Sequence, residues 1–162
     1  DGLVKKYLME HLQVPDYQAR ASAAFAQGNL GKAMRYAKSE DFIERKDHII
    51  SLLRHVEQMD LSEMLAVIKD LGTRKDEVRD YIDLMVLWYR DVLLFKATKD
   101  INQLLFQDEA SYISREASHR SYEKIEEILQ AFEKAKVRLR ANVNFDITME
   151  VLFLSIKERI KK

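Results

Sequence analysis

The stretch TRKDEVRDYIDLMVLWYRDVLLFKAT, residues 73–98, decides the fold of this chain. At about 100° per residue on a helix, its charged side chains from Arg79 to Asp91 fall within one arc of roughly 120°. Nearly all of the remaining circumference is apolar, and it includes Trp88. Because a helix with so wide an apolar surface packs on several neighbours at once, the stretch predicts an all-α protein built around this helix.

Two leucines of the same stretch break its pattern. Leu87 and Leu94 lie inside the polar arc, one heptad apart and beside Arg90 and Asp91. Apolar side chains in such a place could form a surface for another protein chain. Alternatively, residues 101–105 could fold back and cover them. The sequence leaves both interpretations open.

The composition supports the same fold class and excludes several kinds of site. The 162 residues include only four glycines and one proline, and 47% are hydrophobic, which is typical of an all-helical protein. The chain has no cysteine, so disulfides and thiolate metal sites are excluded, which fits a reducing cytoplasm. No apolar run approaches the roughly 18 residues of a membrane span, so no membrane contact is expected.

The charge balance counts against strong binding to nucleic acid. Lys and Arg total 27, as do Asp and Glu, so the net charge is zero, whereas phosphate binding favours a basic excess. One basic run occurs, with cations at Lys134, Lys136, Arg138 and Arg140. Since every second residue on a helix points in a different direction, the run is either a solvated flank or a modest contact with a DNA backbone or a partner chain.

Helix boundaries follow from residues that start or stop helices. Asp60 can accept a hydrogen bond from the first turn of a helix, and Gly72 can end that helix. Asn144 can begin the last helix in the same way. The spacing of apolar residues predicts further helices over residues 3–12, 16–27, 30–37, 39–59, 108–118 and 120–141.

The last helix carries two apolar faces. One contains Phe145, Met149, Leu152, Phe153, Ile156 and Ile160, and the other contains Ile147, Val151 and Leu154. A helix that is apolar on two faces is expected to be buried on both. We therefore expect it to be sandwiched between neighbours.

No group of side chains predicts catalysis, a cofactor or a metal. Glu44 and His48 lie one turn apart, but no third ligand follows at a matching spacing, so a surface ion pair is the better interpretation. The chain has no Gly-x-Ser-x-Gly turn and no phosphate loop. The paired carboxylates Glu126 and Glu127 fall on a solvated helix face. We expect no catalytic residue and no bound cofactor or metal.

The segment Gly28-Asn29-Leu30-Gly31-Lys32-Ala33-Met34 reads as a helix stop followed at once by a helix start. Gly28 can adopt the left-handed conformation that ends a helix, and Asn29 can cap the next one. Taken alone, the segment is an ordinary joint between helices. Short, alanine-rich helices precede Lys38 and long helices follow Ser39, so a domain boundary is expected there.

Five stretches, in order along the chain, resemble the bacterial DNA polymerase III delta-prime family. They are AQGNLGKAM (26–34), LMVLWYRDVLL (84–94), the segment 101–108, the turn at 131–144 and LFL (152–154). The likeness covers nearly the whole chain, and from residue 39 onward it is to the C-terminal domain of that family.

The corner at residues 28–34 also resembles the sensor-2 corner in the lid of clamp-loader AAA+ ATPases, whose pattern is Gly-Ser-x-Arg-x-Ala-Leu. In that family the arginine reaches the nucleotide phosphates, but Gly31 holds its position here. The resemblance therefore implies a degenerate corner made of Gly28, Asn29, Gly31 and Lys32, which does not hydrolyse ATP.

The resemblance implies a role in replication. Residues 1–38 would be the C-terminal part of an AAA+ lid, and residues 39–162 a collar domain that holds the loader ring together. The parent would be a subunit of the DNA-directed DNA polymerase III holoenzyme, a nucleotidyltransferase complex in the bacterial cytoplasm. Its partners would be ATPase and delta-type loader subunits, with indirect or weak DNA contact and no small-molecule substrate.

For the collar role, the candidate interface residues are Leu87, Arg90, Asp91, Leu94, Lys136, Arg138 and Arg140. Two other functions stay open. The chain could be a generic helical adaptor that binds another protein in a groove, or a helical DNA-binding domain, whose affinity would fall steeply with salt.

Overall fold

A computed structural model describes residues 2–11, 19, 23 and 40–157. Within these ranges every regular element is a helix, which confirms the predicted all-α bundle. The α-helices are α1 (Gly2–His11), α4 (Glu40–His55), α5 (Leu61–Gly72), α6 (Val78–Thr98), α7 (Ala110–His119), α8 (Tyr122–Arg140) and α9 (Phe145–Ile156). Single 3-10 turns are η1 (Val56–Gln58), η2 (Ile101–Gln103) and η3 (Gln107–Glu109). The degenerate corner at residues 28–32 and the expected helices over 16–27 and 30–37 lie outside the described residues, apart from Ala19 and Ala23.

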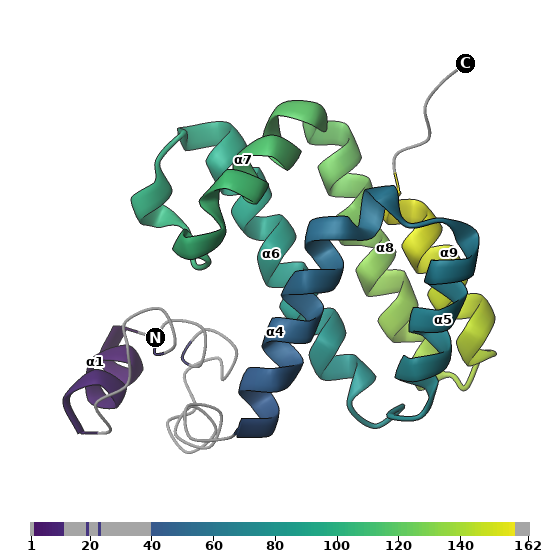
Figure 1. Ribbon diagram of the computed structural model, residues 1–162. Coiled ribbons are helices and arrows are strands. Elements are labelled where there is room, and N and C mark those ends of the chain that lie inside the picture. Colours follow the sequence, from purple (N-terminus) through teal and green to yellow (C-terminus); the bar gives the residue numbers. More distant parts are fainter. Residues whose placement is uncertain (1, 12–18, 20–22, 24–39, 158–162) are drawn as a thin grey trace.

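Helix α6 is the centre of the bundle, as its wide apolar surface predicts. It packs against α4, α7 and α8, while α9 lies against α8 and α5 (Figure 1). Its buried side chains include Tyr81, Met85, Trp88 and Tyr89, each at most 1% exposed. These side chains point in several directions around α6. One helix therefore supplies much of the core, and the neighbouring helices cover it on each side.

The expected start of the central helix at Thr73 is five residues too early. Residues 73–77 form turns, and the N–H groups of Thr73 and Arg74 donate back to the carbonyls of Asp70 and Leu71. These bonds close the C-terminal end of α5 at Gly72, the predicted end. The polar run between Gly72 and Val78 is therefore a link between two helices.

Side-chain caps fix the starts of three helices. Asp60 Oδ1 accepts the N–H of Glu63 at 2.8 Å, and Asn144 Oδ1 accepts the N–H of Ile147 at 3.0 Å, so both predicted caps are confirmed. Helix α8 begins one residue after Ser121, whose Oγ accepts the N–H of Lys124 at 3.0 Å. Its expected start at Arg120 was therefore slightly early.

The expectation that α9 is sandwiched is wrong. One face is buried as predicted, with Met149, Leu152, Phe153 and Ile156 at most 2% exposed. On the other face, Ile147, Val151 and Leu154 are 58%, 43% and 41% exposed. Helix α9 packs on α8, α5 and η1 from one side only, so this second apolar face is left at the surface.

Candidate assembly surface

The outer face of α9 is the most distinctive exposed feature of the bundle. Ile147, Val151 and Leu154 follow one another at spacings of four and three residues, so they form one stripe along the helix, which we call the α9 stripe. Asn144 fixes the start of the helix, and the buried residues on its inner face fix its rotation. The stripe is thus held outward by packing on the opposite side.

A groove borders the α9 stripe. It lies between α8 and α9, has a volume of about 290 Å³, and is lined by Val151, Leu152 and Ser155 on one side. On the α8 side its charged residues include Lys134 and Arg138. An apolar ridge beside a groove with charged walls has the make-up of a protein interface, with an apolar centre and a polar rim.

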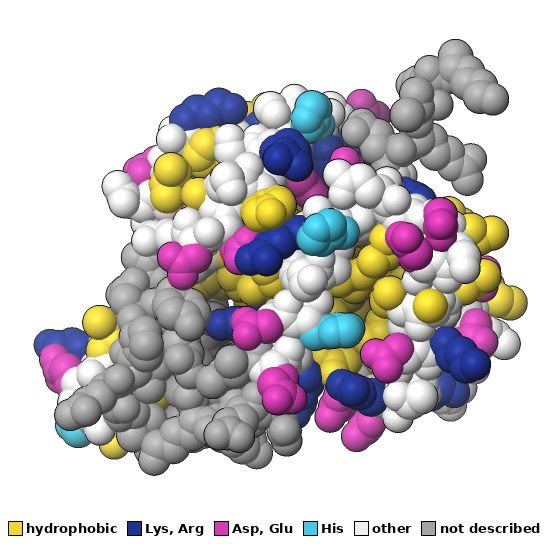
Figure 2. Space-filling view, viewed as in Figure 1, with side chains coloured by type: hydrophobic (Ala, Val, Ile, Leu, Met, Phe, Trp, Pro, Cys, Tyr) yellow, Lys and Arg dark blue, Asp and Glu magenta, His cyan; other side chains and the backbone are white. Residues whose placement is uncertain are grey.

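Other apolar side chains also reach the surface. Leu61 and Leu65 of α5 are 62% and 42% exposed, and hydrophobic side chains are visible over α5 (Figure 2). Exposed apolar side chains thus occur on both α5 and α9, which pack against each other.

The interface candidates predicted on the central helix differ in how far they are exposed. Leu87 is half-buried and packs against the core, and Leu94 is half-buried. Arg90 is exposed and lines a shallow groove of about 420 Å³ with Val86 and Leu129. Leu87, Arg90 and Leu94 lie along α6, whereas the α9 stripe is a separate surface.

Asp91 is not on the polar surface where helical spacing placed it. Its side chain is buried, and its carboxylate oxygens accept the N–H groups of Leu105 and Phe106 at 3.0 and 2.7 Å. A carboxylate that accepts two backbone N–H groups is stabilised in the interior. Asp91 therefore fixes the 101–106 segment against α6, and Leu105 packs on the core beside it.

The basic run divides between two flanks of α8. Lys134 and Arg138 line the groove next to α9. Lys136 pairs with Asp83 of α6 and lies 3.8 Å from Glu133, while Arg140 lines a second hollow beside the start of α6. The run is thus not one stripe, as the alternation of residues suggested.

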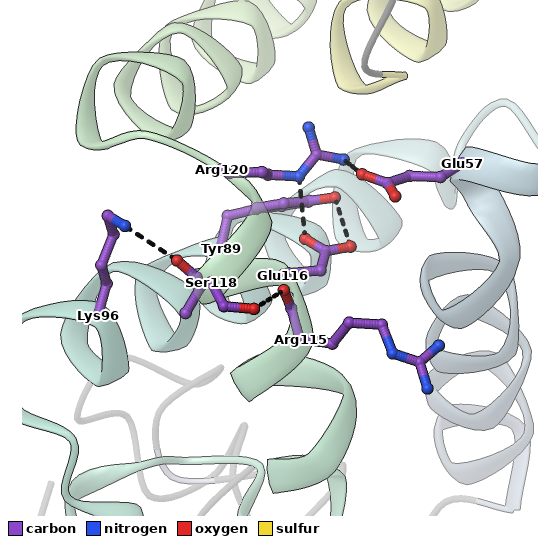
Figure 3. Close-up of polar contacts among 8 residues, drawn as sticks. Glu57, Tyr89, Lys96, Arg115, Glu116, Ser118 and Arg120 are labelled. Atoms are coloured by element: carbon purple, nitrogen blue, oxygen red, sulfur yellow. Dashed lines mark hydrogen bonds and ion pairs between the residues drawn. The ribbon is translucent and has the colours of Figure 1, made fainter. Parts of the chain in front are cut away.

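Sequence reasoning missed a cluster of charges in the interior. Arg120 is 1% exposed, and its Nη2 lies 2.6 Å from Glu57 Oε1 and its Nε 3.4 Å from Glu116 Oε2. The Tyr89 hydroxyl donates to the other Glu116 oxygen at 3.4 Å (Figure 3). The cluster joins α6, α7 and η1 at one point, which no spacing within a single helix could reveal.

Burial changes the protonation of this cluster. Loss of solvent raises the pKa of the Glu116 carboxyl to about 7, although Arg120 opposes the shift. The same cause raises the pKa of the Tyr89 hydroxyl well above its usual value. Arg120, Tyr89 and Glu116 are buried while Glu57 is exposed, so the cluster ties three elements together between the core and the surface.

The expected pair of Glu44 and His48 is not an ion pair in the structure. His48 Nε2 instead lies 4.0 Å from Asp70 Oδ2. No cluster of three or more metal-ligating side chains occurs in the described part of the chain. Among those residues there is also no helix with the length and apolar character needed to cross a membrane.

Comparison with known proteins shows the family of the bundle. Residues 39–158 match the family described as DNA polymerase III, delta subunit, C terminal. The chain belongs to this family. The match spans α4 to α9, and it includes the α9 stripe and the buried cluster of this delta-family C-terminal domain.

One curated relative is the DNA polymerase III subunit delta' of Bacillus subtilis (strain 168). The two sequences are 26% identical over 134 residues, which is 80% of this chain and 40% of the relative. This delta-family chain thus spans less than half the length of that relative. No solved structure matches the chain.

Proposed function

We propose that this chain is the non-catalytic assembly module of a delta-prime-like subunit of the DNA polymerase III clamp loader. The α9 stripe is the observation that carries the proposal. Three exposed apolar side chains on one helix add no stability to a bundle whose core is already formed, unless another surface covers them. The family match and the delta-prime relative favour another loader subunit as that surface.

The division of the chain is part of the same proposal. Residues 1–38 are the end of an AAA+ lid, and residues 39–162 are the collar domain. The family match begins at residue 39, which supports a boundary there. A lid whose corner has Gly31 in place of an arginine has no guanidinium to place on a nucleotide, so the subunit supports ATP-driven loading of the sliding clamp without hydrolysing ATP through this corner.

The partners in this proposal are the ATPase and delta-type subunits of the loader, arranged in a ring in the bacterial cytoplasm. Arg90, Leu94, Arg138 and Leu87 are secondary interface candidates, because they are exposed or half-buried along α6 and α8. Direct DNA contact is weak in this proposal, since the whole chain has no net charge.

The test is to make the α9 stripe polar and to measure assembly. The variant Ile147→Ser/Val151→Ser/Leu154→Ser should fold, because these side chains are exposed, and should lose co-purification with the loader ATPase subunit. Ile101→Ser is the control for loss of an exposed apolar side chain elsewhere, since Ile101 is 48% exposed on η2, which packs on α6. Thermal melting of each purified chain shows that the bundle is intact.

Full retention of the ATPase subunit by the stripe variant would overturn the proposed surface. Loss of retention in the Ile101→Ser control as well would show a general effect of lost apolar area. Binding to an isolated helical peptide without any affinity for AAA+ subunits would instead support the helical-adaptor reading.

A further inference from the structure

A hollow lies where the start of α6, the end of α8 and the start of α9 meet. Its volume is about 640 Å³, within the range of small-ligand sites. The charged side chains that line it are Lys75, Arg79, Lys136, Arg140 and Asp76, and the backbone turn 142–145 forms one wall. We call this hollow the basic pocket.

The basic pocket has a net positive charge. Lys136 is neutralised by Asp83, and Asp76 is the only carboxylate in the lining. Arg79 and Arg140 are exposed, and neither makes an ion pair with the residues that the structure describes. In a chain whose net charge is zero, two guanidinium groups beside Lys75 are a local excess.

Two helix N-termini border the pocket, and each has an acidic residue in its first turn, Asp80 in α6 and Asp146 in α9. Arg79 is in the first turn of α6, where Glu77 supplies no side-chain cap, and Phe145 is the first residue of α9. The Asn144 cap accepts only the N–H of Ile147. The first N–H groups of a helix have no acceptor within it and favour negative charge nearby.

The aromatic wall of the pocket already has a cation over one ring face. Lys75 Nζ lies over the Phe145 ring, 5.3 Å from its centroid. The recognition groups that remain are cations and backbone N–H donors. Such groups fit oxyanions with several charges better than they fit bases or apolar peptide side chains.

From these features we propose that the basic pocket binds phosphate groups. Arg79 and Arg140 supply bidentate donors, Lys75 supplies a third charge, and Asn144 and Phe145 at the start of α9 line the same hollow. The phosphates could belong to a free oligophosphate or to the backbone of a DNA strand. This inference does not rest on the proposed assembly role, because the pocket and the α9 stripe share no residue.

The test compares two variants of the full chain that carry the same change in net charge. Arg79→Gln/Arg140→Gln removes the two guanidinium groups, and Lys69→Gln/Arg115→Gln removes two exposed cations outside the pocket. Binding of tripolyphosphate is measured by calorimetry at low salt. The pocket variant should bind at least about tenfold more weakly, since charge-assisted hydrogen bonds are lost, and the control should bind as the unaltered chain does.

A single-stranded thymidine oligonucleotide then distinguishes the two sources of phosphate. If it binds, its salt slope should fall by about 1.4 in the pocket variant, at roughly 0.7 for each neutralised phosphate. Binding of tripolyphosphate alone assigns the site to a free oligophosphate, and either result supports the proposal. Equal loss of binding in the two variants would overturn it, as would tighter binding of an oligoglutamate peptide than of either phosphate probe.

A third variant should act in the opposite direction. Asp83→Asn removes the main partner of Lys136, so this ammonium becomes available to the pocket. Tripolyphosphate should then bind more tightly than to the unaltered chain, with thermal melting used to show that the bundle persists. Weaker binding in a folded Asp83→Asn chain would contradict the assigned location.

Discussion

Glu116 is an acid held among the side chains of the core. It lies between Arg120 and Tyr89, 8% exposed, and burial raises the pKa of its carboxyl to about 7 from an ordinary 4.5. A folded chain therefore keeps this proton at pH values where the unfolded chain has lost it. Protonation of one residue is thereby linked to the stability of the whole bundle.

The free energy of unfolding should fall as the pH rises from about 4.5 to about 7. In that window the folded state binds more protons than the unfolded state, so the free energy of unfolding falls as the pH rises. The total fall over the window is roughly 3 kcal/mol. Glu116→Gln should remove this part of the slope, because the amide cannot ionise. Urea denaturation at pH 5 and pH 8 measures it, with the exposed Glu126→Gln as control.

The same dependence in the Glu116→Gln chain and in the unaltered chain would contradict the assignment. The slope would then come from another group, and Glu116 would be ionised in the fold and paired with Arg120.

At the scale of elements, three helices have a local reason for their first residue. Asp60, Ser121 and Asn144 all accept an N–H three residues ahead. These caps satisfy donors that a helix leaves unpaired at its start. They were accessible to sequence reasoning because the cap and its partner are neighbours in the chain.

Replacing the α8 cap should lower stability by a modest amount. Ser121→Ala leaves the N–H of Lys124 without its acceptor and should cost about 1 kcal/mol in the free energy of unfolding. Ser118→Ala is the control, since the Ser118 hydroxyl donates to a carbonyl within α7. The midpoint of chemical denaturation measures both, and a cost no larger than that of the control would show that the cap is dispensable.

At the scale of the whole molecule, one core spans α4 to α9. Its buried residues run from Ile49 to Ile156 and include none of the described residues among the first 38 positions, 2–11, 19 and 23. Helix α6 packs against α4, α7 and α8 within this core. The bundle should therefore be able to fold without the N-terminal segment.

A chain of residues 39–162 should unfold in one cooperative transition with a stability close to that of the full chain. Apolar burial is the dominant favourable term in folding, and this fragment retains the whole core cluster. Thermal melting followed by near-ultraviolet circular dichroism measures the transition. Loss of cooperative melting on removal of residues 1–38 would show that the proposed boundary cuts through one folding unit.

Sequence determined those properties of this protein that depend on neighbours along the chain. The apolar circumference of residues 73–98 predicted a central helix, and Asp60, Gly72 and Asn144 marked helix ends, because helical periodicity and capping act over three to four residues. The same local reasoning placed Asp91 on a polar surface and expected α9 to be buried on both faces.

Tertiary structure alone decided which surfaces meet. Asp91 is buried because the N–H groups of residues 105 and 106 reach its carboxylate, and Arg120 is buried because Glu57 lies opposite it. The α9 stripe is exposed because the neighbouring helices lie on the other side of α9. Such pairings join residues far apart in sequence, and their free energy depends on distances that exist only once the helices have packed.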